Sequence, residues 1–292
     1  MTQFKITELG KFQGSVYVPQ ISGNNVVWRS ENPDENKIFF YDGKETIEIS
    51  NTEGSNPQIS GNNVVWSGVD SDSDREIFLY NGKETIQLTD NNVDDIHPQI
   101  YRDKIVWTIG TIDGITIFLD NGQDIIQLND INSSNSFPKI FGDNVIWTAG
   151  DSNKKEELFL YNGKETIQLT NNDVIDYAPQ ISGDNVVWVS GSGVNSEIFL
   201  YNGNKNIQIT NNRTNDVLPY IEENKIVWLN KNESITSVML ATIDNTISTL
   251  TPSGDREAYL SGNRNYKIIT SSTIIILGLV LLCWLKKLQL KC

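Results

Sequence analysis

Apolar and polar residues alternate in short runs along most of the chain, and the pattern itself repeats. The stretch Pro19 to Trp28, PQISGNNVVW, returns with the same offset of nine residues between proline and tryptophan. The further copies begin at Pro57, Pro98, Pro138, Pro179 and Pro219. The tryptophans that end the copies follow one another at intervals of 38, 41, 40, 41 and 40 residues. The repeat unit therefore decides the fold.

Each repeat predicts four short strands separated by turns. The first follows the proline, and the turn Gly23-Asn24-Asn25 supplies residues that tolerate positive φ. The second, such as Val26–Trp28, is β-branched and aromatic, which suits a packed sheet. The third, such as Ile38–Tyr41, ends in Asp-Gly or Asn-Gly and predicts a type I′ hairpin. The fourth, such as Ile86–Leu88, alternates apolar and polar residues and is expected at the outer edge.

A repeat of about 40 residues with four strands is typical of a β-propeller blade. We therefore predict an all-β chain with a propeller domain over residues 1–257, made of four-stranded antiparallel blades. Six blades are expected, or seven if residues 258–270, which faintly echo the first two strands, begin another. Residues 258–267 are then a linker or a partial blade. Residues 4–9 are expected to supply an outer strand that pairs into the last blade and removes free sheet edges.

The C-terminal tail is different in character. Residues 268–285 contain no charged side chain, and Lys286 and Lys287 follow them directly. This pattern predicts a C-terminal hydrophobic helix over 268–285 that crosses a membrane once, and a basic tail over 286–292. A hydrophobic strand of a seventh blade is the alternative. No secretory signal peptide is recognisable at the start. We expect a membrane-anchored protein whose propeller is extracytoplasmic.

Charge and cysteine content narrow the range of partners. The formal net charge of −14 argues against nucleic acid, which is bound through Lys and Arg, and favours a cationic partner. Both cysteines, Cys283 and Cys292, lie in the tail, so the repeats carry no disulfide and no thiol chemistry.

The repeat motifs also carry a resemblance to a known family. The runs PQISGNNVVW, IFLYNG and IQLT resemble TolB-like and WD-type β-propeller repeats of the bacterial or archaeal cell-surface kind, over about 240 of the 292 residues. The resemblance implies a six-bladed ring with a binding role. The repeats depart from the TolB pattern in having Ile after the Pro-Gln pair and no Pro-Asp-Gly turn. No role in the periplasmic Tol system is therefore inferred.

Acidic residues in the loops are the candidate binding residues. They lie between the second and third strands or where one blade crosses to the next: Asp70, Asp72, Asp74, Asp94, Asp95 and Asp176. The alternation in Asp70–Asp74 resembles the start of a calcium loop. Arg75 stands where such a loop has glycine, however, and Asn81 where it has glutamate. No cofactor is therefore predicted, with calcium as the alternative to a solvated acidic loop.

Two of these residues have a second interpretation. Asp95 and Asp176, like Asp216, precede a repeat proline by three residues. An aspartate there can accept hydrogen bonds from nearby backbone amides and fix the crossing between blades.

The function predicted is a non-enzymatic, membrane-anchored scaffold that binds a protein or polysaccharide. The chain has no serine nucleophile elbow, no glycine-rich phosphate loop and no CxxC, and His97 is its only histidine. The tryptophans that end the six copies are expected in the core rather than in a sugar-stacking platform. A propeller enzyme of the polysaccharide lyase or glycosidase type that uses carboxylates is one alternative. A structural surface-layer component is the other.

Overall fold

The structure is a computed structural model of the 292-residue chain. It describes residues 6–12, 14–31, 36–111, 114–129, 134–135, 138–150, 155–243 and 267–269. The chain divides into two compact units, Met1–Asp173 and Val174–Cys292. Every described element is a β-strand except one 3-10 turn, η1 (Gly193–Asn195), so the described chain is all-β as predicted.

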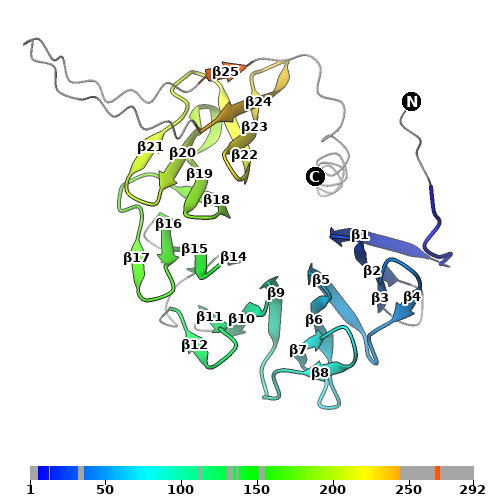
Figure 1. Ribbon diagram of the computed structural model, residues 1–292. Coiled ribbons are helices and arrows are strands. Elements are labelled where there is room, and N and C mark those ends of the chain that lie inside the picture. Colours follow the sequence, from blue (N-terminus) through cyan, green and yellow to red (C-terminus); the bar gives the residue numbers. More distant parts are fainter. Residues whose placement is uncertain are drawn as a thin grey trace, which may run out of the picture. The chain divides into compact units, whose positions relative to one another are not determined.

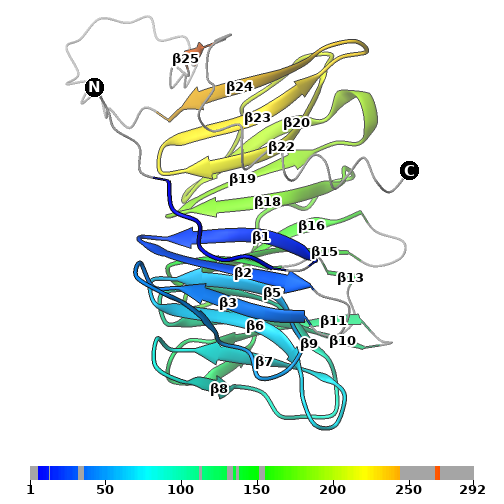
Figure 2. The same cartoon turned by 90° about the vertical axis from the view of Figure 1, so that its right-hand side faces the viewer.

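The first unit holds four antiparallel sheets, numbered here in chain order (Figures 1 and 2). Sheet one contains β1 (Ser15–Ser22), β2 (Asn25–Glu31), β3 (Asn36–Tyr41) and β4 (Thr46–Glu48). Sheet two contains β5 (Gly54–Ser60), β6 (Asn63–Val69), β7 (Arg75–Tyr80) and β8 (Thr85–Gln87). Sheet three contains β9 (Asp95–Tyr101), β10 (Lys104–Thr111), β11 (Gly114–Asp120) and β12 (Ile125–Gln127). Sheet four contains β13 (Ser134–Asn135), β14 (Lys139–Phe141), β15 (Asn144–Gly150), β16 (Glu157–Tyr161) and β17 (Thr166–Gln168), with β13 and β14 both paired to β15.

The second unit holds sheets five and six. Sheet five contains β18 (Asp176–Ser182), β19 (Asn185–Ser190), β20 (Glu197–Asn202) and β21 (Asn206–Gln208). Sheet six contains β22 (Asn215–Glu222), β23 (Lys225–Lys231), β24 (Thr236–Thr242) and β25 (Lys267–Ile269). Four strands in the order of the chain, as the repeat predicts, are therefore seen in both units.

The outer strand of sheet six differs from the sequence-based expectation. That place is taken by β25, which pairs with β24 through Leu240↔Ile269 and Thr242↔Lys267. The N-terminal segment was expected to supply an outer strand, but residues 6–12 form none. Leu9 nevertheless sits where an outer strand would end, because its carbonyl accepts a hydrogen bond from Thr46 Oγ1 at 2.6 Å. Thr85 Oγ1 donates in the same way to the Ile49 carbonyl at 2.7 Å.

Much of the predicted tail lies outside the described residues. Ile268 and Ile269, the first two residues of the predicted membrane helix, belong to β25. The rest of 268–285, the basic tail 286–292 and residues 258–266 are not among the described residues.

The Asn-Gly pairs predict type I′ turns between the third and fourth strands. The structure has a different turn there. The β7–β8 connection has four residues, since Tyr80 pairs with Thr85. Gly82 takes φ +87°, whereas Asn81 is not among the residues with positive φ. The Asn81 side chain instead accepts the amides of Lys83 and Glu84 at 3.0 and 3.1 Å. The asparagine is therefore selected for its side-chain acceptor.

A bulge in the first strand recurs before the repeat proline. The register of β5 against β6 shifts between Ser55 and Gln58, and the residue preceding Pro57 has positive φ. This left-handed residue is Asn56, His97, Ala178 or Leu218 in four of the repeats, with φ between 52° and 56°. A residue before proline ordinarily prefers extended backbone, so the bulge is a specific and repeated feature.

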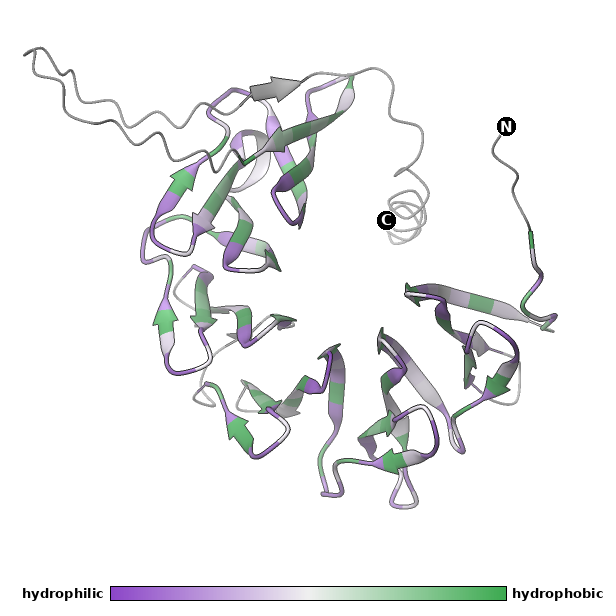
Figure 3. Ribbon diagram, viewed as in Figure 1, coloured by the Kyte–Doolittle hydropathy of each residue, from purple (hydrophilic) through white to green (hydrophobic). Residues whose placement is uncertain are grey.

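The repeat tryptophans are core residues, as predicted. All six are at most 3% exposed. Four of them pack against the sheet before their own, namely Trp66, Trp107, Trp147 and Trp228, as Trp66 does with Val27 and Phe40 of sheet one. In sheets one to five each stacks on the cross-strand phenylalanine, as Trp188 does on Phe199 with ring centroids 5.7 Å apart. The alternation of hydrophobic and hydrophilic residues along the strands is visible in Figure 3.

Candidate functional site

The densest group of carboxylates lies at the β6–β7 connection in sheet two. Asp70 follows β6, Asp74 precedes β7 and Glu76 is the second residue of β7. One carboxylate oxygen from each lies within 4.8 Å of the others. We call these three residues the sheet-two carboxylate cluster. It is the one group of three or more potential metal ligands of the His, Cys, Asp and Glu types within the described residues.

The loop itself brings the first two aspartates together. Val69 pairs with Arg75, and the Asp70 amide donates to the Asp74 carbonyl at 3.1 Å, which closes the hairpin. Inside the loop the Asp72 amide donates to Asp70 Oδ1 at 2.8 Å, and Ser73 takes φ +75°. Asp72 is exposed and lies outside the cluster. The alternating aspartates therefore have two roles, since Asp70 and Asp74 converge while Asp72 stays exposed outside the cluster.

Glu76 is the member that sequence reasoning missed. Its side chain is 0% exposed, and its Oε1 accepts the Asn91 amide at 2.7 Å. Its Oε2 is buried and receives no hydrogen bond, and the same is true of Asp74 Oδ1. Burial raises the pKa of the Glu76 carboxyl, and neighbouring Asp95 adds to the rise. Burial also raises the pKa of Asp74, with Asp70 as the next cause.

The other predicted binding residues divide into an exposed one and two buried ones. Asp94 is exposed, and its Oδ1 accepts the Arg75 amide at 2.8 Å. Asp95 and Asp176 are 0% exposed. Their side chains therefore do not form part of an exposed acidic surface.

Both buried aspartates accept a hydrogen bond from the tryptophan of their own repeat. Trp107 Nε1 donates to Asp95 Oδ1 at 2.6 Å, and Trp188 Nε1 donates to Asp176 Oδ1 at 3.0 Å. The same bond joins Trp228 to Asp216 at 2.9 Å. The predicted structural role therefore exists, but its donor is an indole rather than a backbone amide. The constant offset of twelve residues between aspartate and tryptophan is the sequence signal that could have revealed it.

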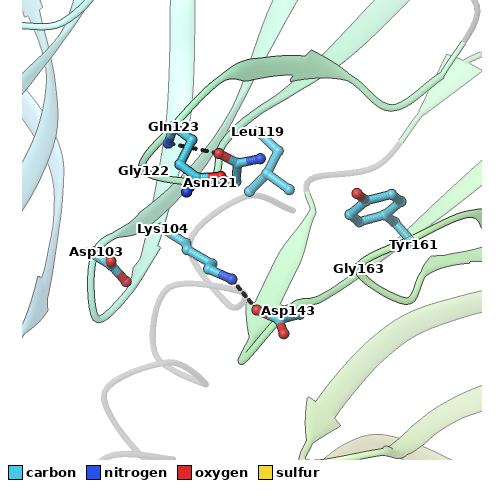
Figure 4. Close-up of a pocket in the computed structure, with 9 residues that line it drawn as sticks. All are labelled: Asp103, Lys104, Leu119, Asn121, Gly122, Gln123, Asp143, Tyr161 and Gly163. Atoms are coloured by element: carbon cyan, nitrogen blue, oxygen red, sulfur yellow. Dashed lines mark hydrogen bonds and ion pairs between the residues drawn. The ribbon is translucent and has the colours of Figure 1, made fainter.

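A polar cavity of about 440 Å³ lies between sheets three and four (Figure 4). Turn residues line much of it, including Asp103, Asn121 and Asp143, together with Lys104 of β10 and Tyr161 of β16. Lys104 Nζ forms an ion pair with Asp143 and so bridges the two sheets. The lining offers hydrogen-bonding groups and a neutralised charge pair, which suits a small polar ligand more than an apolar one. His97, the only histidine, does not line the cavity.

No family model matches the sequence, and no curated protein matches it either. Solved structures do match it, in contrast. The β-propeller domain of the trilobed protease from Pyrococcus furiosus superposes with a TM-score of 0.57 at 13% identity, over 77% of this chain and 81% of that one. The fold is a β-propeller.

Two further solved structures belong to the same range of similarity. The acylaminoacyl peptidase of Pyrococcus horikoshii gives a TM-score of 0.54 at 16% identity, and the match covers 77% of this chain but 44% of the peptidase. TolB from Acinetobacter baumannii gives 0.46 at 15% identity, over 69% of this chain and 56% of TolB, which is too loose for any further argument. At these identities the comparisons with the two Pyrococcus structures establish the propeller fold alone.

The membrane helix predicted from the sequence falls on residues that the structure does not describe beyond Ile269. Within the described part of the propeller chain, no helix has the length and apolar character needed to cross a membrane.

Proposed function

We propose that this chain is a non-enzymatic, six-bladed binding propeller whose β6–β7 loop receives a cationic surface of a partner protein. The observation that carries the proposal is the sheet-two carboxylate cluster. Among the described residues, no Lys, Arg or His forms an ion pair with Asp70, Asp74 or Glu76. The cluster therefore leaves negative charge that a partner can neutralise.

The position of this charge supports binding. A loop that projects from a packed sheet holds its side chains in place at little further cost in conformational entropy on binding. Asp72 and Asp94 extend the acidic surface beyond the cluster, since both are exposed. With a net charge of −14, the chain attracts cationic partners over a distance and speeds their association.

A lysine-rich octapeptide tests the proposal, because it presents the same cationic chemistry as the partner surface that the loop would receive. The variant Asp70→Asn/Asp74→Asn should weaken its binding about fivefold or more, and added salt should reduce the difference. The matched control is Asp103→Asn/Asp184→Asn, which removes the same charge from exposed turns. If both double variants bind the peptide equally, the loop is not the binding surface.

We also propose that the segment after β25 anchors the propeller in a membrane, with the propeller outside. The support is the apolar sequence from Thr270 to Leu285 and the lysines that follow it. A chain truncated after Thr270 keeps β25 and should move from the membrane fraction to the soluble fraction. Protease added to intact cells should degrade the full chain. Failure of the truncation to release the protein would contradict the anchor, and protection from protease would contradict the orientation.

A further inference from the structure

The sheet-two carboxylate cluster has the dimensions of a calcium site. Calcium binds oxygen ligands at about 2.3–2.6 Å, so two oxygens on one ion lie at most about 5 Å apart. The oxygens of Asp70, Asp74 and Glu76 lie within 4.8 Å of one another. These pairwise separations are of the size found between ligands of one ion, so small side-chain rotations are enough to bring all three oxygens to it.

Two oxygens in the cluster lack the partners that buried polar atoms normally have. Glu76 Oε2 and Asp74 Oδ1 are both buried and receive no hydrogen bond. A buried carboxylate oxygen without a donor or a cation is costly, because it has lost its hydration. Both residues supply a carboxylate oxygen to the cluster. A cation bound there would lie beside both carboxylates and offset their negative charge.

A comparison with sheet five separates the cluster from the general architecture of the repeat. Glu197 occupies the position of Glu76 in its own repeat, is buried, and accepts the Asn212 amide through Oε1 at 2.8 Å. Its Oε2 is likewise buried without a hydrogen bond. The connection before it, residues 191–196, contains no acidic residue. The repeat thus places a buried glutamate in both sheets, and sheet two adds Asp70 and Asp74 beside it.

We propose that Asp70, Asp74 and Glu76 bind a divalent cation, and that the ion is calcium. All three ligands are carboxylates, the oxygen donors that hard cations prefer, and together they can supply up to six oxygens. Water completes the coordination at the exposed side of the loop. The ion joins the end of β6 to the start of β7 and holds the loop in one conformation.

The cation site stands independently of the proposed partner. An ion of charge +2 offsets most of the charge of three carboxylates, so calcium competes with a lysine-rich peptide for the loop. The two proposals can therefore fail separately, because one is tested by calcium alone and the other by the peptide in the presence of a chelator.

The test uses the full chain, freed of metal with EGTA and returned to EGTA-free buffer. Calorimetric titration with calcium chloride should show one ion per chain, and about 1 mM calcium should raise the melting temperature. Asp70→Asn, Asp74→Asn and Glu76→Gln should each weaken binding about tenfold or more. Asp72→Asn removes the same charge from the same loop, and Glu197→Gln changes the equivalent buried glutamate. Both controls should keep the affinity of the parent chain.

The measurement of calcium binding to the parent chain alone can overturn the proposal. The test therefore remains decisive even if a variant fails to fold. No binding heat and no shift in melting temperature at about 1 mM calcium would exclude the site. Equal weakening by Asp72→Asn or Glu197→Gln would show that the ion binds elsewhere or through general charge. Equal affinity for magnesium chloride would overturn the assignment of calcium.

Discussion

Sheets one and five follow the same repeat but treat their buried tryptophans differently. In sheet five Asp176 faces Ser190, two residues after Trp188, and accepts its indole hydrogen bond. In sheet one Val16 occupies this register position opposite Ser30, and Trp28 Nε1 is buried without an acceptor. Both tryptophans still stack on a phenylalanine across the strand pair. The apolar pattern is thus enough to place the tryptophan, whereas its polar partner is an optional addition to local stability.

The largest expected effect comes from removing the indole donor in sheet five. Trp188→Phe leaves a small cavity and leaves the buried Asp176 carboxylate without this hydrogen bond, so it should cost about 3 kcal/mol of unfolding free energy. Trp28→Phe removes an indole N–H that has no acceptor, and should cost about 1 kcal/mol. Denaturant unfolding of both variants measures the difference. Equal losses would mean that the hydrogen bond contributes nothing beyond packing.

Removing the acceptor should have a smaller effect. Asp176→Ala leaves the Trp188 indole buried without a partner and should cost about 2 kcal/mol. The matched change Val16→Ala in sheet one removes only two methyl groups from a half-exposed side chain and should cost less than about 1 kcal/mol. Thermal unfolding of the two variants, compared with the parent chain, checks the order. An Asp176→Ala variant as stable as Val16→Ala would refute the account.

Supplying the missing acceptor should reduce the difference between the sheets. Val16→Asp places a carboxylate at the position that Asp176 has in sheet five. It should raise the free energy of unfolding by about 1 kcal/mol. Because Val16 is 49% exposed, the carboxylate loses little hydration. The gain should vanish when the same change is made in a Trp28→Phe chain, which lacks the indole donor. A gain that persists there would have another origin.

The smallest effect concerns the bulge residue, which is His97 in sheet three and Ala178 in sheet five. Burial lowers the pKa of His97, so in the window between its folded and unfolded values the unfolded chain binds more protons. Stability should therefore fall as the pH decreases from about 7 through the folded pKa of His97. His97→Asn should reduce this slope in melting temperature, because asparagine takes positive φ at the same place in sheet two. An unchanged slope would assign the pH dependence to other groups.

Most of the fold could be predicted from the sequence, because proline, tryptophan and the Asn-Gly pairs recur at fixed offsets. The turn type was missed because the side chain of Asn81 competes with the hairpin geometry that its dipeptide favours. The Asp176–Trp188 bond depends on the strand register across a bulge, and its trace in the sequence is the constant offset of twelve residues between aspartate and tryptophan.

The candidate site was predicted in part, for a related reason. Asp70 and Asp74 are close along the chain, so their meeting could be foreseen. Glu76 joins them only because the β6–β7 hairpin closes between Val69 and Arg75. An acidic residue directly before the apolar run in three repeats, Glu76, Glu157 and Glu197, was the available signal.

The strand β25 follows β24 only after a long intervening segment, which affects how the chain folds during synthesis. In sheet two four residues, 81–84, separate the third strand from the fourth, whereas residues 243–266 separate β24 from β25. On a ribosome, each earlier sheet can be completed soon after its third strand emerges. The outer edge of β24 stays unpaired until β25 has been synthesised, and Ile235 and Val238 are exposed near it. During that interval an unpaired, partly apolar edge is open to another nascent copy, so late translation is the stage at which this propeller is most prone to aggregate.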